Sequence, residues 1–454
     1  MATYDLNRSE LNSLLAADHI DPTVRASVLQ YLSENGGLTN STITVPVQES
    51  GYPPLDPNAQ VLIVDSPTAT VATDANLKAI IDVADASLTV TGSSNVFVGT
   101  GPGADKVDMT GSTGDDVVMT GSGGDTVLGG QGADSIYGGD GNDSLVAGTG
   151  SFQLLEGGSG RDTLIGGSGV FDTISGGTQG DVIHGGSGDF QLIQGGSGTD
   201  TIFGGNGNYD TIDGSTSGSS SGGGGGDDGG GGCGNGNGGG HGNFSSDCGD
   251  QGNGDGNGHG GQGNGNGNSS QPGDIIYGGN GNYDLINGSS GDDTIIAGNG
   301  SWDTINGGDG NDAIHGGSGD HENIDGGSGN DSLFGGSGNF DTITGGNGND
   351  QIFGGSGAAQ SLVAGSGNNT LVSGTGNDTL TGGSGTDLFV VGRVGNDTIN
   401  GNGGHNDSVQ FDDTYENAHI SNSHGSTTVS FSDTGQSIQI TGVHELVFTD
   451  KTVH

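Results

Sequence analysis

Aspartate is the residue type whose spacing in this sequence could do chemistry, because it closes a series of short glycine-rich segments such as "GGSGRD" (157–162) and "GGSGND" (326–331). The chain carries 55 Asp and Glu against 7 Lys and Arg, a formal net charge of −48. A chain this acidic either stays unfolded through self-repulsion or has its carboxylates neutralised by cations. The same charge excludes nucleic acid as a partner, because phosphate would be repelled.

Other residue sets that could do chemistry are weaker. The segment "GSSSG" (218–222) satisfies the G-x-S-x-G pattern of hydrolases, but it lies in low-complexity Ser/Gly sequence without a strand and helix around it. Cys233, Cys248, His241 and His259 are irregularly spaced in a glycine tract, which favours a passive loop over a soft-metal site. The two cysteines are either one disulfide or free thiols. We find no catalytic constellation and expect no enzyme.

The aspartates belong to an internal repeat that begins near residue 99. Its sharpest copies are "GGQGADSIY" (129–137), "GGDGNDSLV" (138–146), "GGSGRDTLI" (157–165) and "GGSGNDSLF" (326–334). These copies match the glycine-rich nonapeptide of the RTX, or hemolysin-type, calcium-binding repeat family. The sequence resembles that family over roughly residues 100 to 400.

An inserted aromatic residue or histidine lengthens every second copy to ten residues. The insertions are 19 residues apart, at Phe152, Phe171, Phe190 and Tyr209 and again at Tyr283, Trp302, His321 and Phe340. One coil is therefore a nine-residue unit plus a ten-residue unit. Tyr209 and Tyr283 are 74 residues apart, which is 19 plus 55. We interpret residues 214–268 as a flexible Gly-rich insertion that leaves the register intact.

Each unit places one aliphatic residue at the centre of a short strand. Stacked at ~4.8 Å per coil, these residues form two facing ladders. We assign Ile136, Leu145, Leu164, Ile183 and Ile202 to one wall, and Ile174, Ile193, Ile212, Ile305 and Ile343 to the other. The predicted fold class is all-β: a parallel β-roll, or β-solenoid, of about 14 coils, with a short N-terminal helical segment and a C-terminal β cap.

The family resemblance implies what holds such coils together. It implies Ca²⁺ between successive turns on one edge, ligated by the motif aspartate and by backbone carbonyls. The matching residues are Asp125, Asp134, Asp143, Asp162, Asp181, Asp200, Asp293, Asp312, Asp331, Asp350, Asp378, Asp387 and Asp397, with Asn369 interrupting the row.

The ten-residue units depart from this pattern at the acidic position. The residue there is Asp172, Asp210, Asp284, Asp303 or Asp341 in some copies and Gln153, Gln191, Glu322 or Gln360 in others. We predict that this edge holds fewer ions or none, and that stacked aromatic rings stabilise it instead.

The residue after each inward aliphatic points outward, and its character differs between the walls. On the nine-residue wall it is Ile165, His184, Phe203, Tyr277, Ile296, His315, Phe334 or Phe353. On the ten-residue wall it is Glu156, Ser175, Gln194, Asp213, Asn287, Asn306 or Asp325. A long apolar patch usually marks an interface. Self-association and cover by the N-terminal helices or the C-terminal segment both remain open.

The two ends of the chain differ from the repeats. "SELNSLLAADH", with Leu11, Leu14 and Leu15 on one stripe, and "DPTVRASVLQYLSENGG", with Asp21 as N-cap, predict two helices. The last fifty residues predict alternating strands. We divide the chain into a helical segment (1–40), a β-rich cap that starts the solenoid (41–98), two parts of the repeat array (99–213 and 269–404) around the insertion (214–268), and a C-terminal β cap (405–454).

The sequence also suggests how the chain is exported. It has no apolar run long enough to span a membrane, and its start lacks the pattern of a cleaved signal peptide. Its tail is similar in kind to the uncleaved C-terminal signal by which RTX proteins leave the cell through type I secretion. Outside, calcium at ~10⁻⁴–10⁻³ M would neutralise the turns and drive folding.

We therefore expect an extracellular or cell-surface calcium-binding protein with a structural role, as a surface-layer, filament or biofilm-matrix subunit. It would self-associate through the apolar strand face or the chain ends. The alternatives are an adhesin or other binding module for carbohydrate, such as a surface polysaccharide, or for ice. An RTX toxin is the least favoured.

Overall fold

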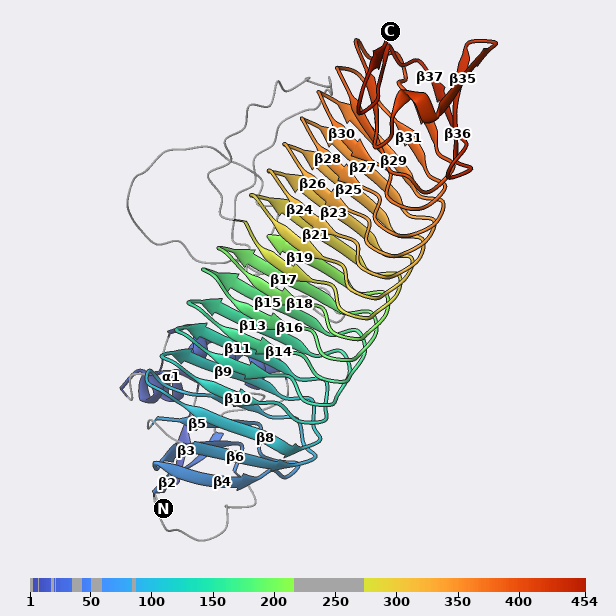
Figure 1. The fold of residues 1–454 in the computed structure, drawn as a ribbon. Helices are drawn as coiled ribbons and strands as arrows, with labels where there is room; N and C mark the ends of the chain where they lie inside the picture. The colour runs from blue at the N-terminus through green and yellow to red at the C-terminus, as the bar shows by residue number, and fades with distance from the viewer. Residues whose placement is uncertain are drawn as a thin grey trace, which may run out of the picture. The chain divides into compact units, whose positions relative to one another are not determined.

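The computed structural model describes residues 3–6, 8–17, 20, 22–34, 43–49, 59–83, 87–215 and 273–454. In these residues the chain winds back and forth between two parallel sheets, and the strands stack in sequence order (Figure 1). The fold is an all-β parallel solenoid of about 15 turns with a repeat near 19 residues, as the sequence predicts. The insertion (214–268) lies almost wholly outside the described residues, together with Cys233, Cys248 and the N-cap Asp21.

Sheet I is the wall that follows the ten-residue turns. Its solenoid strands are β3 (Val61–Asp65), β5 (Ala79–Asp82), β7 (Phe97–Gly99), β9 (Val117–Ser122), β11 (Ser135–Asp140), β13 (Leu154–Ser159), β15 (Thr173–Thr178), β17 (Leu192–Ser197), β19 (Thr211–Ser215), β21 (Leu285–Ser290), β23 (Thr304–Asp309), β25 (Asn323–Ser328), β27 (Thr342–Asn347), β29 (Ser361–Ser366), β31 (Thr379–Thr381), β33 (Thr398–Asn400) and β37 (Ser437–Thr441).

Sheet II is the facing wall. Its strands are β4 (Thr68–Ala72), β6 (Ser87–Gly92), β8 (Lys106–Ser112), β10 (Thr126–Leu128), β12 (Ser144–Val146), β14 (Thr163–Ile165), β16 (Val182–His184), β18 (Thr201–Phe203), β20 (Ile275–Tyr277), β22 (Thr294–Ile296), β24 (Ala313–His315), β26 (Ser332–Phe334), β28 (Gln351–Phe353), β30 (Thr370–Val372), β32 (Leu388–Val391), β34 (Ser408–Phe411) and β38 (Glu445–Val447).

The core is the pair of aliphatic ladders between the sheets. The inward side chains of the strands from β10 to β33 are fully buried in one cluster, for example Ile305 of β23 and Ile314 of β24. One prediction about the walls is wrong: Ile136 pairs with Leu155 and Val118 in sheet I, and not with Leu145 in sheet II. The turn before Ile136 (129–134) carries no aromatic insertion, so its length does not identify its wall.

The register continues across the insertion. Thr201 of β18 pairs with Ile275 of β20, and Thr211 of β19 pairs with Leu285 of β21, each 74 residues apart. The backbone N–H of Asp200 likewise donates to Asp274 Oδ1 at 2.7 Å. The 19-residue ladder therefore joins the two parts of the repeat array directly, as predicted.

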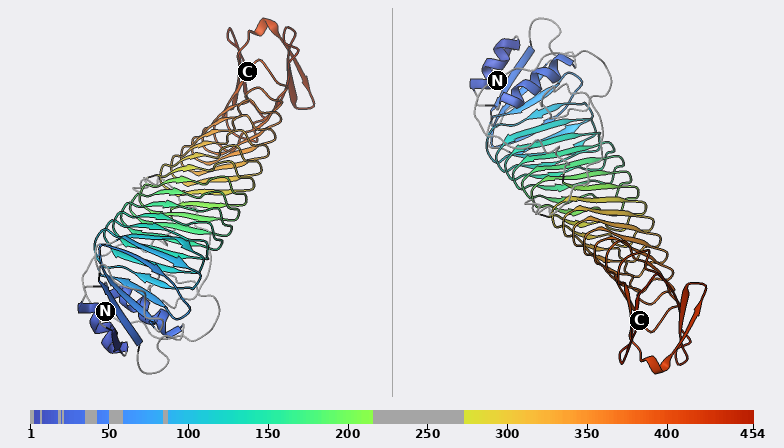
Figure 2. Two further views of the ribbon diagram at one scale, coloured as in Figure 1. Left: turned by 90° about the horizontal axis from the view of Figure 1, so that it is seen from below. Right: turned by 90° about the horizontal axis from the view of Figure 1, so that it is seen from above.

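The N-terminal helices cover the start of sheet I. Helices α1 (Arg8–Ala17) and α2 (Pro22–Glu34) bury stripes that include Leu11, Leu15, Val28 and Leu32 against the outward residues of β3, β5 and β7 (Figure 2). Strand β2 (Ile43–Glu49) pairs with β3 in parallel, and β1 (Thr3–Leu6) closes this end by antiparallel pairing with β2. Neither of these two described helices is long and apolar enough to cross a membrane.

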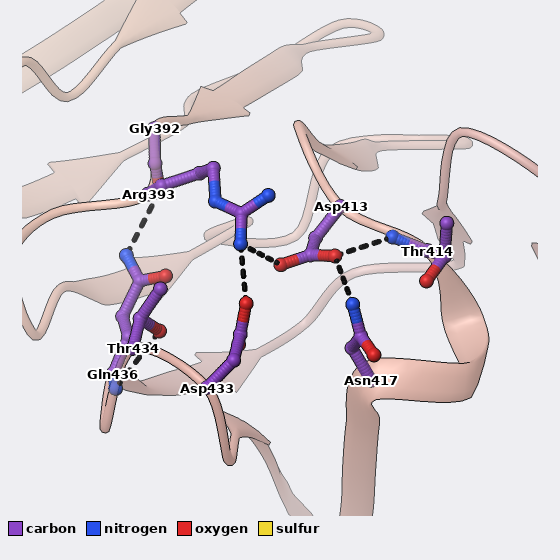
Figure 3. Close-up of polar contacts among 8 residues, drawn as sticks. All are labelled: Gly392, Arg393, Asp413, Thr414, Asn417, Asp433, Thr434 and Gln436. Atoms are coloured by element: carbon purple, nitrogen blue, oxygen red, sulfur yellow. Dashed lines mark hydrogen bonds and ion pairs between the residues drawn. The ribbon is translucent and has the colours of Figure 1, made fainter.

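The C-terminal residues close the other end. Strands β35 (Ala418–Ser423) and β36 (Ser426–Phe431) form an antiparallel hairpin on β37, and β39 (Thr452–Val453) pairs antiparallel with β38. The Arg393 guanidinium reaches two carboxylates of this cap, Asp413 at 3.1 Å and Asp433 (Figure 3). Asn417 and Thr414 donate hydrogen bonds to Asp413 and, aided by Arg393, lower the pKa of this buried carboxyl.

The continuous ladder predicts that the coils fold without the intervening residues. Replacing residues 216–272 by two residues would leave Gly214, Ser215, the linker, Gly273 and Asp274 as a six-residue turn, the length of Gly157–Asp162. We expect the same far-UV circular dichroism and the same calcium dependence as the full chain. A one-residue linker is the matched control, because it shortens the turn and should disturb the pairing of β18 with β20. Loss of folding in both chains would contradict the prediction.

Candidate metal centre

The turns from sheet I to sheet II form the acidic edge, on which an aspartate, or Asn369 in one coil, ends each turn. In the turn Gly157–Asp162, Gly158 and Gly160 have φ of 108° and 135°, which only glycine adopts readily. The acidic edge consists of Asp105, Asp125, Asp143, Asp162, Asp181, Asp200, Asp274, Asp293, Asp312, Asp331, Asp350, Asn369, Asp387 and Asp407.

The structure divides the predicted ligands between two edges. Asp134, Asp378 and Asp397 lie on the opposite edge, while the ten others lie on the acidic edge. Sequence reasoning omitted Asp274 and Asp407 from the row, and also Asp105, whose backbone N–H donates to Asp125 Oδ1 at 2.8 Å. Asp274 stands 19 residues before Asp293, so the repeat spacing could have found it. Asp407 lies 20 residues after Asp387, so a search at the 19-residue interval misses it.

Most acidic-edge carboxylates have one oxygen bound and one oxygen free; in Asp387 the second oxygen accepts the backbone N–H of Gly383 at 2.9 Å. Asp331 Oδ1 accepts the backbone N–H of Asp312, one coil earlier, at 2.8 Å, and this bond repeats along the edge. Asp331 itself is buried, and its Oδ2 has no hydrogen-bond partner. The same is true of Oδ2 in Asp125, Asp143, Asp162, Asp181, Asp200, Asp274, Asp293, Asp312, Asp350 and Asp407. A buried carboxylate oxygen without a partner costs free energy unless a cation or proton neutralises it.

The free oxygens face a small space that is lined by other oxygens. A methyl group built on Gly326 would lie 2.6 Å from Asp331 Oδ2 and 2.6 Å from the carbonyl oxygen of Gly345 in the next coil. The corresponding space beside Gly345 is bounded by Asp350 Oδ2 and the carbonyl of Ala364, both at 2.5 Å. Within the described residues no three His, Cys, Asp or Glu side chains cluster, so backbone carbonyls would complete any ligand set. This all-oxygen environment fits Ca²⁺.

The electrostatics of the edge favour a cation for the same reason. Burial, reinforced by the charges of Asp293 and Asp331, raises the pKa of Asp312 to about 8 against the opposing hydrogen bond from Asp293. Burial and the neighbouring carboxylates also raise the pKa of Asp181 and of Asp331 to about 7. The column thus stacks carboxylates that destabilise one another when they are ionised and unneutralised.

Asn369 shows what the edge looks like where one carboxylate is missing. Its Oδ1 accepts the Asp350 N–H at 2.8 Å, so the coil-to-coil hydrogen bond is kept. Its Nδ2 donates to Asp387 Oδ1 at 3.1 Å, where an aspartate would present a second oxygen. The amide therefore preserves the backbone ladder and removes an anionic ligand.

The turns from sheet II to sheet I form the aromatic edge, where the inserted residues stack as predicted. Ring centroids of Phe152, Phe171, Phe190, Tyr209, Tyr283, Trp302, His321 and Phe340 follow one another at 4.1 to 6.2 Å with interplanar angles of 7° to 14°. All eight residues have φ between 60° and 68°. This left-handed backbone costs about 1–2 kcal/mol per residue, and a stacked pair contributes about 0.5–1.5 kcal/mol.

The inserted residue also turns the carboxylates of the aromatic edge away from the space used on the acidic edge. At Gly278 and Gly335, the first glycines of two such turns, the nearest side-chain atom is the Cδ1 of Ile286 or Ile343. The Oδ2 of Asp303 instead faces Gly300, which lies three residues before Asp303 in the same turn. Asp303 Oδ2 therefore lies beside the Gly281 carbonyl oxygen of the preceding coil, whereas Asp331 Oδ2 lies beside a carbonyl oxygen of the next coil.

The outer faces of the sheets differ as predicted. The outward row of sheet II is half-buried to exposed, and His184, Phe203 and Tyr277 stack on one another, as do His315, Phe334 and Phe353. Strands β14, β16, β18, β20, β22, β24, β26, β28 and β30 contain no Asp, Glu, Lys or Arg. The N-terminal helices lie on sheet I, so they leave this apolar row of sheet II uncovered.

Comparisons with known proteins agree with this geometry. A family model described as the RTX calcium-binding nonapeptide repeat matches residues 110–145, 147–170, 171–189, 192–210, 273–301, 302–320, 321–339, 325–360, 363–393 and 389–407, just over half of the chain. A search of curated proteins found no match.

Exchanging Asp and Asn on the acidic edge should change the number of bound ions. We expect Asp331→Asn to keep the hydrogen bond from Asp312, to bind fewer Ca²⁺ by equilibrium dialysis, and to need severalfold more Ca²⁺ to fold. Asn369→Asp is the matched reverse change and should bind more Ca²⁺. Equal ion counts in both variants and the parent chain would show that these carboxylates are not ligands.

Without metal, the raised pKa values predict that acid orders the coils. A buried aspartate whose folded pKa exceeds its unfolded value of about 3.9 stabilises the fold below that value. This contribution is lost as the pH rises through the folded values of about 6 to 8 found at Asp125, Asp181 and Asp312. In chelator, far-UV circular dichroism should show more strand at about pH 5 than at about pH 8. Millimolar Ca²⁺ should abolish the difference; equal order at both pH values in chelator would contradict the assignment.

Proposed function

This chain belongs to the RTX calcium-binding nonapeptide-repeat family, and on that premise we propose that it is a secreted structural protein without enzymatic activity. Proteins of this family are typically exported and extracellular. In our proposal the coils order outside the cell, where calcium is abundant, and the folded chains assemble into a surface layer, a filament or a biofilm matrix. The C-terminal β cap would act as the type I secretion signal.

The acidic edge supplies the residues for calcium. The carboxylates of Asp125, Asp143, Asp162, Asp181, Asp200, Asp274, Asp293, Asp312, Asp331, Asp350, Asp387 and Asp407 would hold the ions together with the turn carbonyls. Bound Ca²⁺ supplies the positive charge that the buried free oxygens lack. We keep Asp134, Asp378 and Asp397 as candidate ligands on the opposite edge, where Asp134 Oδ2 already accepts the N–H of Gly130 at 3.0 Å.

The apolar outer row of sheet II carries the assembly part of the proposal. The chain has a net charge of −48, so two copies repel each other over most of their surface. Strands β14 to β30 of sheet II present no charged side chain, and their outward aromatic and aliphatic residues remain partly exposed. This face is therefore where a second copy could pack with the least electrostatic cost.

The alternative of a carbohydrate-binding role for the aromatic edge receives less support. Sugars pack on the flat faces of aromatic rings, whereas neighbours 4.1 to 6.2 Å away occupy the faces of most of these rings. The residues as a whole stay partly exposed, Tyr209 by 48% and Trp302 by 50%. We therefore favour a stabilising role for this stack.

Electron microscopy of the purified chain tests the proposal. We expect ordered filaments or sheets in millimolar Ca²⁺ and none in chelator. The double variant Phe203→Thr, Phe334→Thr should fold normally but fail to assemble. The control Gln194→Thr, Asn306→Thr alters outward residues of sheet I and should assemble like the parent. Dispersed single molecules of the parent chain in both Ca²⁺ and chelator would contradict the proposed structural role.

A further inference from the structure

Glu322 differs from every other acidic residue at its position on the aromatic edge. It occupies the place of Asp303 and Asp341 in the coils before and after it, but its side chain is one methylene longer. Its exposed fraction is only 1%, and neither Oε1 nor Oε2 has a hydrogen-bond partner. A buried side chain with two unpartnered oxygens requires a physical explanation.

The extra methylene returns the carboxylate to the space that the aromatic insertion takes from aspartate. A methyl group built on Gly316, the first residue of this turn, would collide with Glu322 Oε2 and lie 2.8 Å from Ile324 Cδ1 and 3.0 Å from the Gly335 carbonyl oxygen of the next coil. This pairing of a carboxylate oxygen with the next coil's carbonyl is the one found beside Gly326 on the acidic edge. At the equivalent Gly278 and Gly335, isoleucine carbon is the nearest side-chain atom instead.

Glutamine at the same position reaches the same place but carries no charge, although its Oε1 also lacks a hydrogen-bond partner in Gln153, Gln191 and Gln360. In Gln360, Nε2 donates to the Gly338 carbonyl at 3.0 Å and to Asp341 Oδ2 at 3.2 Å. Its Oε1 faces Gly354 as Glu322 Oε2 faces Gly316. The amide thus brings its own hydrogen-bond donors to the turn, whereas Glu322 brings a negative charge and no donor.

We propose that Glu322 forms a cation site on the aromatic edge, in which its carboxylate and the carbonyls of the adjoining turns bind a hard divalent ion such as Ca²⁺. Burial, reinforced by the charges of Asp341, Asp303 and Asp320, raises the pKa of Glu322 to about 9. The local charge therefore attracts a cation, and the ligands in reach are oxygens, which Ca²⁺ prefers. This inference does not depend on whether the chain assembles.

Trp302 provides a local probe of the site. It is the only tryptophan of the chain, and its ring stacks on His321, the neighbour of Glu322, at 4.1 Å. Tb³⁺ takes oxygen ligands as Ca²⁺ does, and it luminesces when an excited indole lies close by. We expect tryptophan-excited Tb³⁺ emission from the parent chain, and its loss in Glu322→Gln. Glu322→Asp keeps the charge but withdraws the oxygens, so it should lose the emission as well.

The control removes a carboxylate of the same coil on the other edge. Asp312→Asn should keep the tryptophan-excited emission, because Asp312 ends the turn after β23 and lies on the acidic edge. Circular dichroism in millimolar Ca²⁺ verifies that each variant is folded. Three results would overturn the inference: no emission from the parent chain, full emission from folded Glu322→Gln, or equal loss in Asp312→Asn.

Discussion

The burial of one carboxylate in almost every coil is the constraint on which the rest of this structure depends. Along the acidic edge, each aspartate uses one oxygen to accept the N–H of the coil before it, which places the second oxygen out of water. The hydrogen bond that joins one coil to the next therefore also buries the second oxygen, and this burial creates the need for a cation. The C-terminal cap shows the alternative, because Asn417 and Thr414 donate hydrogen bonds to Asp413 and Arg393 adds a positive charge, so that the pKa of Asp413 falls where that of Asp312 rises.

The turns of the two edges stack on the turns of the next coil in different ways. Glycine lets the acidic-edge turns approach one another closely enough to direct carbonyls and carboxylates at a common space. On the aromatic edge, one extra residue displaces the carboxylate and places a ring in a left-handed position, where it stacks on the next ring. Side-chain length then decides what happens locally, since Asp303, Gln360 and Glu322 place their polar atoms differently in equivalent turns.

Repetition made most of the fold predictable from the sequence. A fixed interval of 19 residues determines which strands pair, so the ladders, the register across the insertion and the aromatic stack follow from counting. Apart from the omission of Asp274, the errors occur where the spacing or the insertion pattern changes. Asp134 and Ile136 come after a turn without an insertion, so sequence alone did not place them on the correct edge and wall. The position of the unpartnered oxygens of Glu322 depends on the length of its side chain. The spacing of residues in the sequence does not predict that position.

The antiparallel strands at both ends of sheet I have a consequence for growth. A solenoid could in principle lengthen by templating, each new molecule adding its first coil to the last coil of another. Here β1 at one end and the β35–β36 hairpin at the other occupy the backbone groups to which such a coil would bond. The length of the parallel ladder in sheet I is thus set by this chain's own coils, and a second molecule cannot extend it without displacing β1 or the hairpin.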